Sequence, residues 1–376
     1  MRVGGTAPAA RIPMVDIARL YGIALVYYGH VVERMMYLGD PAAAAQYKFI
    51  YSFHMTLFFV LAGFISKPSL YESRPAVFLK DRWTSRLVPF LFFNAVLAGL
   101  ALVAPRDFPP IDLSGPAAFG MGVARTLVDL PVFNIPTWFL MCLVSVEFIH
   151  YAAFRALRQS DARILAAIPV FYLAGYTLNR VVDPFNAGQP FSGNVWFVHE
   201  AVAMYAFYLL GVLMRRRRFL MGPVPAWILA GGAVAALAFV TFTYGLNQGP
   251  FRLIQAVVVL AGGHGNIFWF PVTAVAGSLA VLLLARLTPP APFLTYLGSN
   301  VLVLFCLNGV FYHSLNGPVA AWAMAAFPGS PWAAFGVGVT MTAASLALCL
   351  PVVRLLNAHL PWALGKGSAH RAEITA

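Results

Sequence analysis

Ten apolar runs of about 20 residues divide the chain, and clusters of polar residues, proline and glycine separate them. Such a run predicts a helix that crosses a bilayer, because its length at 1.5 Å per residue matches the hydrocarbon thickness. The predicted spans are 12–32, 48–66, 86–104, 136–156, 163–180, 196–214, 225–245, 266–285, 294–313 and 331–353. The pattern therefore predicts an all-α polytopic membrane protein with about ten transmembrane helices.

The connections between these spans are too short to hold a soluble domain. The longest, 105–135 and 246–265, are rich in proline and glycine, and within the second an apolar stretch at 251–263 is too short to cross. We expect that stretch to be re-entrant or interfacial. The domain plan is a tail over 1–11, a transmembrane domain over 12–356 and a second tail over 357–376, so any function must reside in the bundle.

The positions of lysine and arginine indicate the orientation. With the N-terminus in the cytosol, 19 of the 25 cationic side chains fall on the cytosolic side and six fall outside. Such a bias is usual for membrane proteins, so both tails are predicted to be cytosolic. The same bias accounts for the net charge of +12 without a nucleic-acid partner. With 60% hydrophobic and 10% charged residues, the composition excludes a soluble domain.

The first span carries two side chains that hydrocarbon disfavours. Arg19 and His30 are eleven residues apart, which places them on one helix face at a separation of about 16 Å along the axis. In the predicted orientation Arg19 lies toward the cytosol and His30 toward the outer leaflet. Intramembrane ionisable residues of this kind are functional candidates by default.

Two further groups are predicted near the depth of His30. Glu33 lies one turn beyond it, and His54 enters the second span at a similar depth. The three make a candidate general-base site with an orienting carboxylate. The alternative for either histidine is a structural hydrogen bond to a backbone carbonyl.

A candidate anion site is predicted at the cytosolic end of the same helices. Asp16 and Arg19 are spaced to pair on the helix surface, and Arg82 and Arg86 precede the third span. Guanidinium groups match phosphate oxygens, although a topological role alone also explains such cations. The topological reading is favoured for Arg215 to Arg218. Glu147, with His150 one turn later, is a further candidate, and a structural hydrogen bond is equally compatible with it.

The three cysteines, Cys142, Cys306 and Cys349, lie in apolar runs at unrelated spacings. They support neither a disulfide framework nor a metal cage, and no metal is expected.

These residues, in this order, resemble the family-3 membrane-bound acyltransferases. The matching segments are Asp16-x-x-Arg19 with His30, FHMTLFFVLAGF at 53–64, FLKDRWTSRLVPF at 78–90, PTWFLMCL at 136–143, YAFYLLGVLMRRR at 205–217 and YLGSNVLVLF at 296–305. The YSFHMTLFF segment at 51–59 is similar to sequences of the branch related to fucose 4-O-acetylases. The chain departs from the pattern at Asn308, where many relatives have histidine, at Ala62 before Gly63, and in the four-residue spacing of Arg82 and Arg86.

The resemblance implies an enzyme of the bacterial inner membrane that moves an acyl group, acetyl in the first instance, from cytosolic acyl-CoA to a hydroxyl of a glycan or glycolipid. It makes His30 the catalytic histidine and places Arg19, Arg82 and Arg86 near the donor. The rival hypothesis is a secondary transporter or lipid-linked sugar flippase, in which Arg19, His30 and Glu147 line a path. The missing internal repeat counts against this rival, as it does not suit transporters built on duplicated halves.

Overall fold

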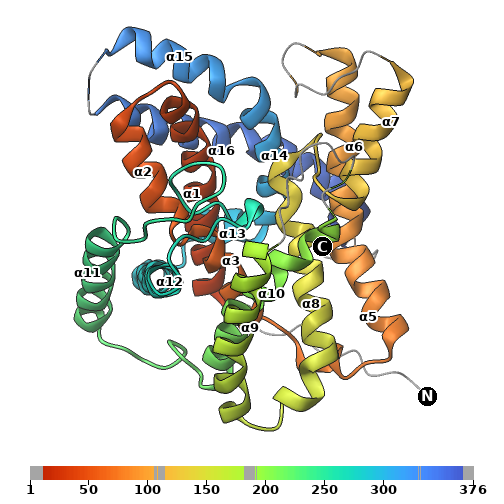
Figure 1. Ribbon diagram of the computed structural model, residues 1–376, viewed down its shortest axis with the longest axis vertical. Helices are drawn as coiled ribbons and strands as arrows, with labels where there is room; N and C mark the ends of the chain where they lie inside the picture. The colour runs from red at the N-terminus through yellow and green to blue at the C-terminus, as the bar shows by residue number, and fades with distance from the viewer. Residues whose placement is uncertain are drawn as a thin grey trace.

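The computed structural model describes residues 12–366 except 106–107, 109–114, 182–190, 192, 329 and 331. The predicted tail 1–11, and residues 367–376 of the other tail, lie outside the described residues. Within them the chain is helical, without a strand, and the helices form one bundle (Figure 1). The helices are α1 (Pro13–Tyr37), α2 (Pro41–Tyr51), α3 (His54–Phe64), α4 (Pro68–Tyr71), α5 (Pro75–Arg82), α6 (Val88–Val103), α7 (Pro116–Val128), α8 (Trp138–Leu157), α9 (Asp161–Val181), α10 (Val198–Arg216), α11 (Ala226–Thr243), α12 (Trp269–Leu287), α13 (Pro292–Ser299), α14 (Val301–Ser314), α15 (Asn316–Ala326) and α16 (Ala333–His359).

Each predicted span falls on one helix or one pair of helices. Among the described residues, eight helical stretches are long and apolar enough to cross a membrane, and the bent pair α13–α14 makes nine if it counts as one span. The eight are 41–64, 75–103, 135–157, 161–181, 195–216, 226–243, 269–287 and 333–359. The α1 helix, which carries Asp16, Arg19, Glu33 and Arg34, is not among them, although its 25 residues reach about 37 Å. The protein is thus a multi-pass helical membrane protein, and the count of ten and the sides of the termini stay predictions.

The α1 helix lies at the centre of the bundle. It begins with Pro13, whose fixed φ and missing N–H suit a first helical turn. It packs against α2, α3, α12, α13, α14, α15 and α16. Gly298 in α13 has no side chain, and an added Cβ there would lie 1.9 Å from the Asp16 carbonyl oxygen. That close approach fixes the end of α1 that bears Asp16 and Arg19.

The second predicted span, 48–66, is two helices rather than one. Asp40 caps α2 by accepting a hydrogen bond from the Ala43 N–H at 2.9 Å, so the helix begins before the predicted boundary. It ends at Tyr51, and the Ser52 hydroxyl donates to the Phe49 carbonyl at 2.6 Å, which competes with the main-chain ladder. His54 is consequently the first residue of α3, at the break between the helices.

The ninth predicted span, 294–313, is bent by 71° between α13 and α14. Asn300 stands at the bend, donating to the Tyr296 carbonyl and accepting from the Asn357 amide, both at 2.9 Å. Side-chain bonds of this kind replace the helical ladder at the break. The bend turns α14 so that its residues face the far end of α1.

The two long connections hold more structure than their composition predicted. The first contains α7, and the second folds back onto the bundle through a 3₁₀ turn at Val259–Ala261. Val257, Val259 and Ala261 are buried, so the apolar stretch predicted to be re-entrant or interfacial packs against the helices. In Figure 1 this connection, between α11 and α12, lies beside α1 and α2.

Candidate active site

A small cavity lies beside the C-terminal half of α1. Its volume is about 80 Å³, and it collects residues from α1, α2, α3 and α14 with the 257–260 segment. The polar and aromatic residues that line it are His30, Glu33, Tyr47, Tyr51, His54, Trp138, Phe305 and Tyr312. His30, Glu33 and His54, which the sequence predicts at one depth, therefore meet in one chamber, called the histidine chamber below.

His30 is held from α14. Its Nδ1 lies 2.5 Å from Oδ1 of Asn308, and its ring centre lies 4.8 Å from that of Tyr312. When Nδ1–H donates to the Asn308 oxygen, Nε2 carries the lone pair and is the nitrogen that can take a proton. The sequence did not predict this contact, because 278 residues separate the two side chains.

The other two predicted residues have partners of their own. The Tyr37 hydroxyl donates to Glu33 Oε1 at 3.2 Å, and Nδ1 of His54 donates to the Ile50 carbonyl at 3.0 Å. The backbone bond that we considered as the alternative for His54 is thus present, and it leaves Nε2 with the lone pair. The Tyr51 ring lies 4.5 Å from His54 and stacks on Tyr47. These rings, with Tyr312, make the chamber largely aromatic.

A second, much larger pocket of about 960 Å³ lies at the other end of α1. Five cationic side chains and two carboxylates are among its lining residues: Arg19, Lys67, Arg158, Arg215 and Arg216, with Asp16 and Glu72. Arg19 lies 3.6 Å from Asp16, Arg158 lies 2.6 Å from Glu72, and Arg216 lies 3.0 Å from Asp161. The surplus of cations makes this cationic pocket suited to an anion with several negative charges. Arg215 and Arg216, which the sequence analysis assigned to topology, line it as well.

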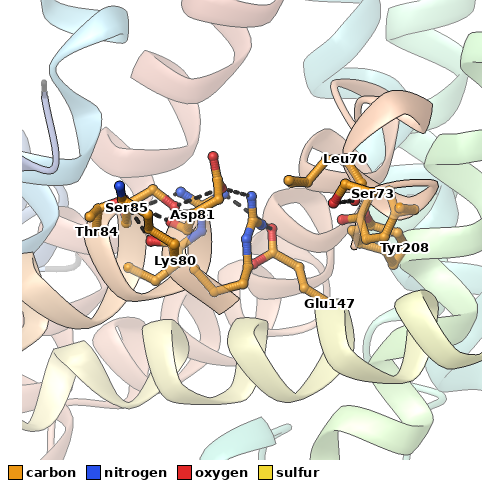
Figure 2. A network of polar contacts seen from close by, with 11 residues as sticks. Leu70, Ser73, Lys80, Asp81, Thr84, Ser85, Glu147 and Tyr208 are labelled. Atoms are coloured by element: carbon orange, nitrogen blue, oxygen red, sulfur yellow. Dashed lines mark hydrogen bonds and ion pairs between the residues drawn. The ribbon is translucent and has the colours of Figure 1, made fainter. Parts of the chain in front are cut away.

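Arg82 and Arg86 do not line the cationic pocket. Both guanidinium groups contact Oε1 of Glu147 in α8, Arg86 at 3.1 Å, and Arg82 also contacts Asp81. Figure 2 shows Asp81 and Glu147 in this network of polar contacts. The Arg82 and Glu147 side chains are 8% and 4% exposed, so the pair is shielded from solvent. The π-helical turn Trp83–Leu87 between α5 and α6 carries Arg86. These arginines thus join α5 and α6 to α8.

Packed aromatic rings lie between the two cavities. The α1 and α3 helices run from one to the other, with Arg19 and Ser66 at the cationic pocket and His30 and His54 at the histidine chamber. Halfway along, Phe58 contacts Phe139 at 5.7 Å between ring centres, and Phe139 contacts Phe305 at 5.6 Å. The two cavities are therefore separate in this structure.

The fit between α3 and α10 depends on glycine. An added Cβ on Gly63 would lie 1.9 Å from the Tyr208 carbonyl oxygen, and one on Gly211 would lie 2.0 Å from the Val60 carbonyl oxygen. A side chain at either position would push the helices apart. Gly63, in the matching segment 53–64, thus has a packing role. The chain departs from the family pattern at its neighbour, Ala62, and keeps the glycine.

In the part of the chain that the structure describes, no group of three or more His, Cys, Asp and Glu side chains is arranged to hold a metal ion.

Comparison with known proteins identifies the family of the chain. A family profile described as "Acyltransferase domain" (acyltransferase 3) matches residues 12–353. Nodulation protein NolL of Sinorhizobium fredii is 26% identical over 213 residues, 51% of this chain and 53% of that protein. Nodulation protein NolL of Mesorhizobium japonicum is 27% identical over 168 residues, 43% of this chain and 42% of that protein. The chain thus matches about half the length of these curated relatives, and no solved structure matches it. Because the profile covers nearly the whole chain, with both cavities inside it, the chain belongs to the acyltransferase 3 family.

Proposed function

We propose that the protein moves an acyl group, acetyl in the first instance, from cytosolic acyl-CoA to a hydroxyl of a glycan or lipid-linked glycan on the other side of the membrane. The observation that carries this proposal is the pair of cavities at the two ends of α1, one cationic and one built around His30. The family assignment supports acyl transfer as the reaction. The bacterial inner membrane and the N-in, C-in orientation belong to the same proposal.

The cationic pocket is the proposed site of the coenzyme A phosphates. Arg19 lines it, and Lys67 is an exposed cation at its rim. Charge-assisted hydrogen bonds to phosphate are among the stronger ones in proteins, so this end of α1 suits the anionic part of the donor. Arg82 and Arg86 remain candidate donor contacts, and taking that role requires them to leave Glu147.

The spacing on α1 supports the path of the donor. The helix is continuous from Pro13 to Tyr37, so Arg19 and His30 are about 16 Å apart along its axis. With the coenzyme A phosphates at Arg19, an extended pantetheine arm has the length needed to place the thioester at His30. Because Phe58, Phe139 and Phe305 fill the space between the cavities, the proposed path requires these rings to move when the donor binds.

His30 is the proposed general base. Its Nε2 takes the proton of the acceptor hydroxyl while the oxygen attacks the thioester carbonyl, and the tetrahedral intermediate expels the coenzyme A thiolate. The imidazolium then returns the proton to the leaving sulfur. Transfer through an acyl-histidine is a second route with the same side chain. Glu33 and His54 line the same chamber and are proposed to bind and orient the hydroxyl.

The test is a comparison of cells with the gene, without it, and with the His30→Gln variant expressed at the same level. We expect ester-linked acetyl groups on surface glycans only with the wild-type gene. Equal acetylation in all three would refute the proposal. Uptake or flipping of a solute by the purified protein, without consumption of acyl-CoA, would favour the transporter hypothesis.

A further inference from the structure

One stretch of chain contributes to two hollows. Residues 257–260 line the histidine chamber, while Phe251 to Gln255, just before them, line a separate groove. Just beyond this stretch, the Tyr176 hydroxyl donates to the Gly265 carbonyl at 2.7 Å and Asn247 accepts from the Asn266 N–H at 2.7 Å. Gly262 and Gly265 have φ values of +64° and +73°, which glycine adopts without strain. The chamber and the groove are thus neighbours across one segment.

The groove has a volume of about 540 Å³ and is polar. Its lining residues are Lys48, Gln248, Gly249, Phe251, Arg252, Leu253, Ile254 and Gln255. A smaller hollow of about 320 Å³ shares Lys48, Ile254 and Gln255 with it and extends along α2. Lys48 lies on α2 one turn before Tyr51, which lines the histidine chamber. The groove is therefore at the His30 end of the bundle, opposite the cationic pocket.

The charge of the groove is positive. Lys48 and Arg252 are its ionisable lining residues, and neither glutamine adds charge. The Lys48 ammonium lies 5.8 Å from the centre of the Phe251 ring, and among the described residues no carboxylate forms an ion pair with it. Arg252 donates to the carbonyl of the buried Asn179 in α9, so its guanidinium is already held by the bundle. The Lys48 ammonium suits a phosphate, which accepts charge-assisted hydrogen bonds.

The groove also carries apolar side chains at its edge. Leu253 is 54% exposed and Leu246, close in the chain, is 48% exposed. Cations beside exposed aliphatic groups are typical of a surface where a lipid head group meets a protein.

We propose that this groove binds the phosphate of the acceptor, and that the acceptor is a phosphorylated glycan whose hydroxyl reaches His30 past residues 257–260. This inference rests on the proposed acyl transfer and adds the substrate class. Phosphate is the chemistry that Lys48 recognises, whether it links the glycan to a lipid or stands on a soluble glycan. The cationic pocket and the groove thus bind the phosphates of donor and acceptor at opposite ends of α1.

The experiment compares three probes: a disaccharide diphosphate joined to a short prenol, the same disaccharide 1-phosphate without lipid, and the free disaccharide. The full-length protein in nanodiscs of neutral lipid transfers labelled acetyl groups from acetyl-CoA to each. For Lys48→Gln we expect the ratio of kcat/KM for a phosphorylated probe to that for the free sugar to fall about tenfold, the cost of one charge-assisted hydrogen bond. Lys48→Arg retains the ratio, and Arg180→Gln, which removes an exposed cation outside the groove, is the matched control.

Each outcome decides the proposal. A fall for both phosphorylated probes supports recognition of phosphate itself, and a fall for the prenol-linked probe alone assigns the phosphate to a lipid-linked acceptor. An unchanged ratio, or an equal loss for all three probes, overturns the proposal.

Direct measurement of probe binding tests the groove even when no acetyl group is transferred. If the wild type transfers acetyl to none of the probes, the acyltransferase proposal fails for these acceptors, and direct binding of fluorescent probes still tests the groove. We then expect the prenol diphosphate probe to bind about tenfold more weakly to Lys48→Gln than to the wild type. Equal binding of phosphorylated and free sugars by the wild type would refute phosphate binding at the groove, whether or not the protein transfers acetyl groups.

Discussion

The two ends of α1 differ in size, charge and lining residues. The cationic pocket has about 960 Å³ and five lining cations, whereas the histidine chamber has about 80 Å³ and aromatic walls. An open, charged pocket can hold a hydrated, highly charged ligand. A chamber this small holds little water, and a water-poor site strengthens electrostatic interactions and protects a thioester from hydrolysis. In the proposed function one helix thus separates binding of the donor's charge from the chemistry, and the variants below test that division.

The largest effect is expected from His30→Gln in the histidine chamber. Removal of a general base lowers kcat by about 10²- to 10⁴-fold, while the KM for acyl-CoA stays near the wild-type value because the cationic pocket is intact. The measurement is steady-state transfer by the purified protein. A wild-type kcat in a well-folded variant would contradict the assignment.

Glu147→Gln tests whether Arg82 and Arg86 serve structure or the donor. The variant removes the carboxylate that both guanidinium groups share. Arg82 keeps its contact with Asp81, so the expected loss of stability is at the lower end of that for a broken buried pair, about 3 kcal/mol. The measurement is the thermal unfolding of the variant and of the wild type in detergent. The control is Glu72→Gln, which breaks a half-exposed pair with Arg158 and should cost less than about 1 kcal/mol. Equal loss in the two variants would refute a structural role for Glu147.

Asn308→Leu tests how His30 is positioned. Loss of the oxygen that accepts from Nδ1 is expected to lower kcat about 10- to 100-fold, with little change in the KM for either substrate. Asn308→His, which restores a ring nitrogen as acceptor, should recover part of the rate. Equal losses in the two variants, accompanied by lower thermal stability, would indicate packing damage instead of lost positioning.

The smallest effect is expected at the cationic pocket. Arg19→Gln removes one of five cations, so the KM for acyl-CoA should rise about tenfold while kcat changes little. Arg155→Gln, an exposed cation of α8 outside the pocket, is the control. A fall in kcat without a change in the donor KM would place Arg19 at the chemistry and break the division between the two ends.

The local sequence pattern was enough to predict the long helices and the part of the candidate site formed by His30, Glu33 and His54. Hydrophobic runs located every long helix, because a span must satisfy its own backbone and present apolar side chains over a fixed length. Helical periodicity placed Arg19 and His30 on one face, and the antiparallel second span placed His54 at the depth of His30. The structure brings His30, Glu33 and His54 into one cavity.

The rest of the site depends on contacts that sequence spacing does not encode. Asn308 and Tyr312 reach His30 only because α14 is turned by the bend at Asn300. The helix break before His54 and the folding of residues 251–263 onto the bundle come from side-chain bonds and burial between distant segments. Arg215 and Arg216 illustrate a further limit, because a topological signal and a pocket lining use the same residue type.

The most direct test of the account is the sidedness of the reaction. The protein is reconstituted in sealed vesicles of known orientation, with labelled acetyl-CoA on one side and a membrane-impermeant acceptor on the other. We expect transfer when the donor is on the side of the cationic pocket and the acceptor is on the side of the histidine chamber, and none in the reverse arrangement. Transfer only when donor and acceptor share one side would contradict it.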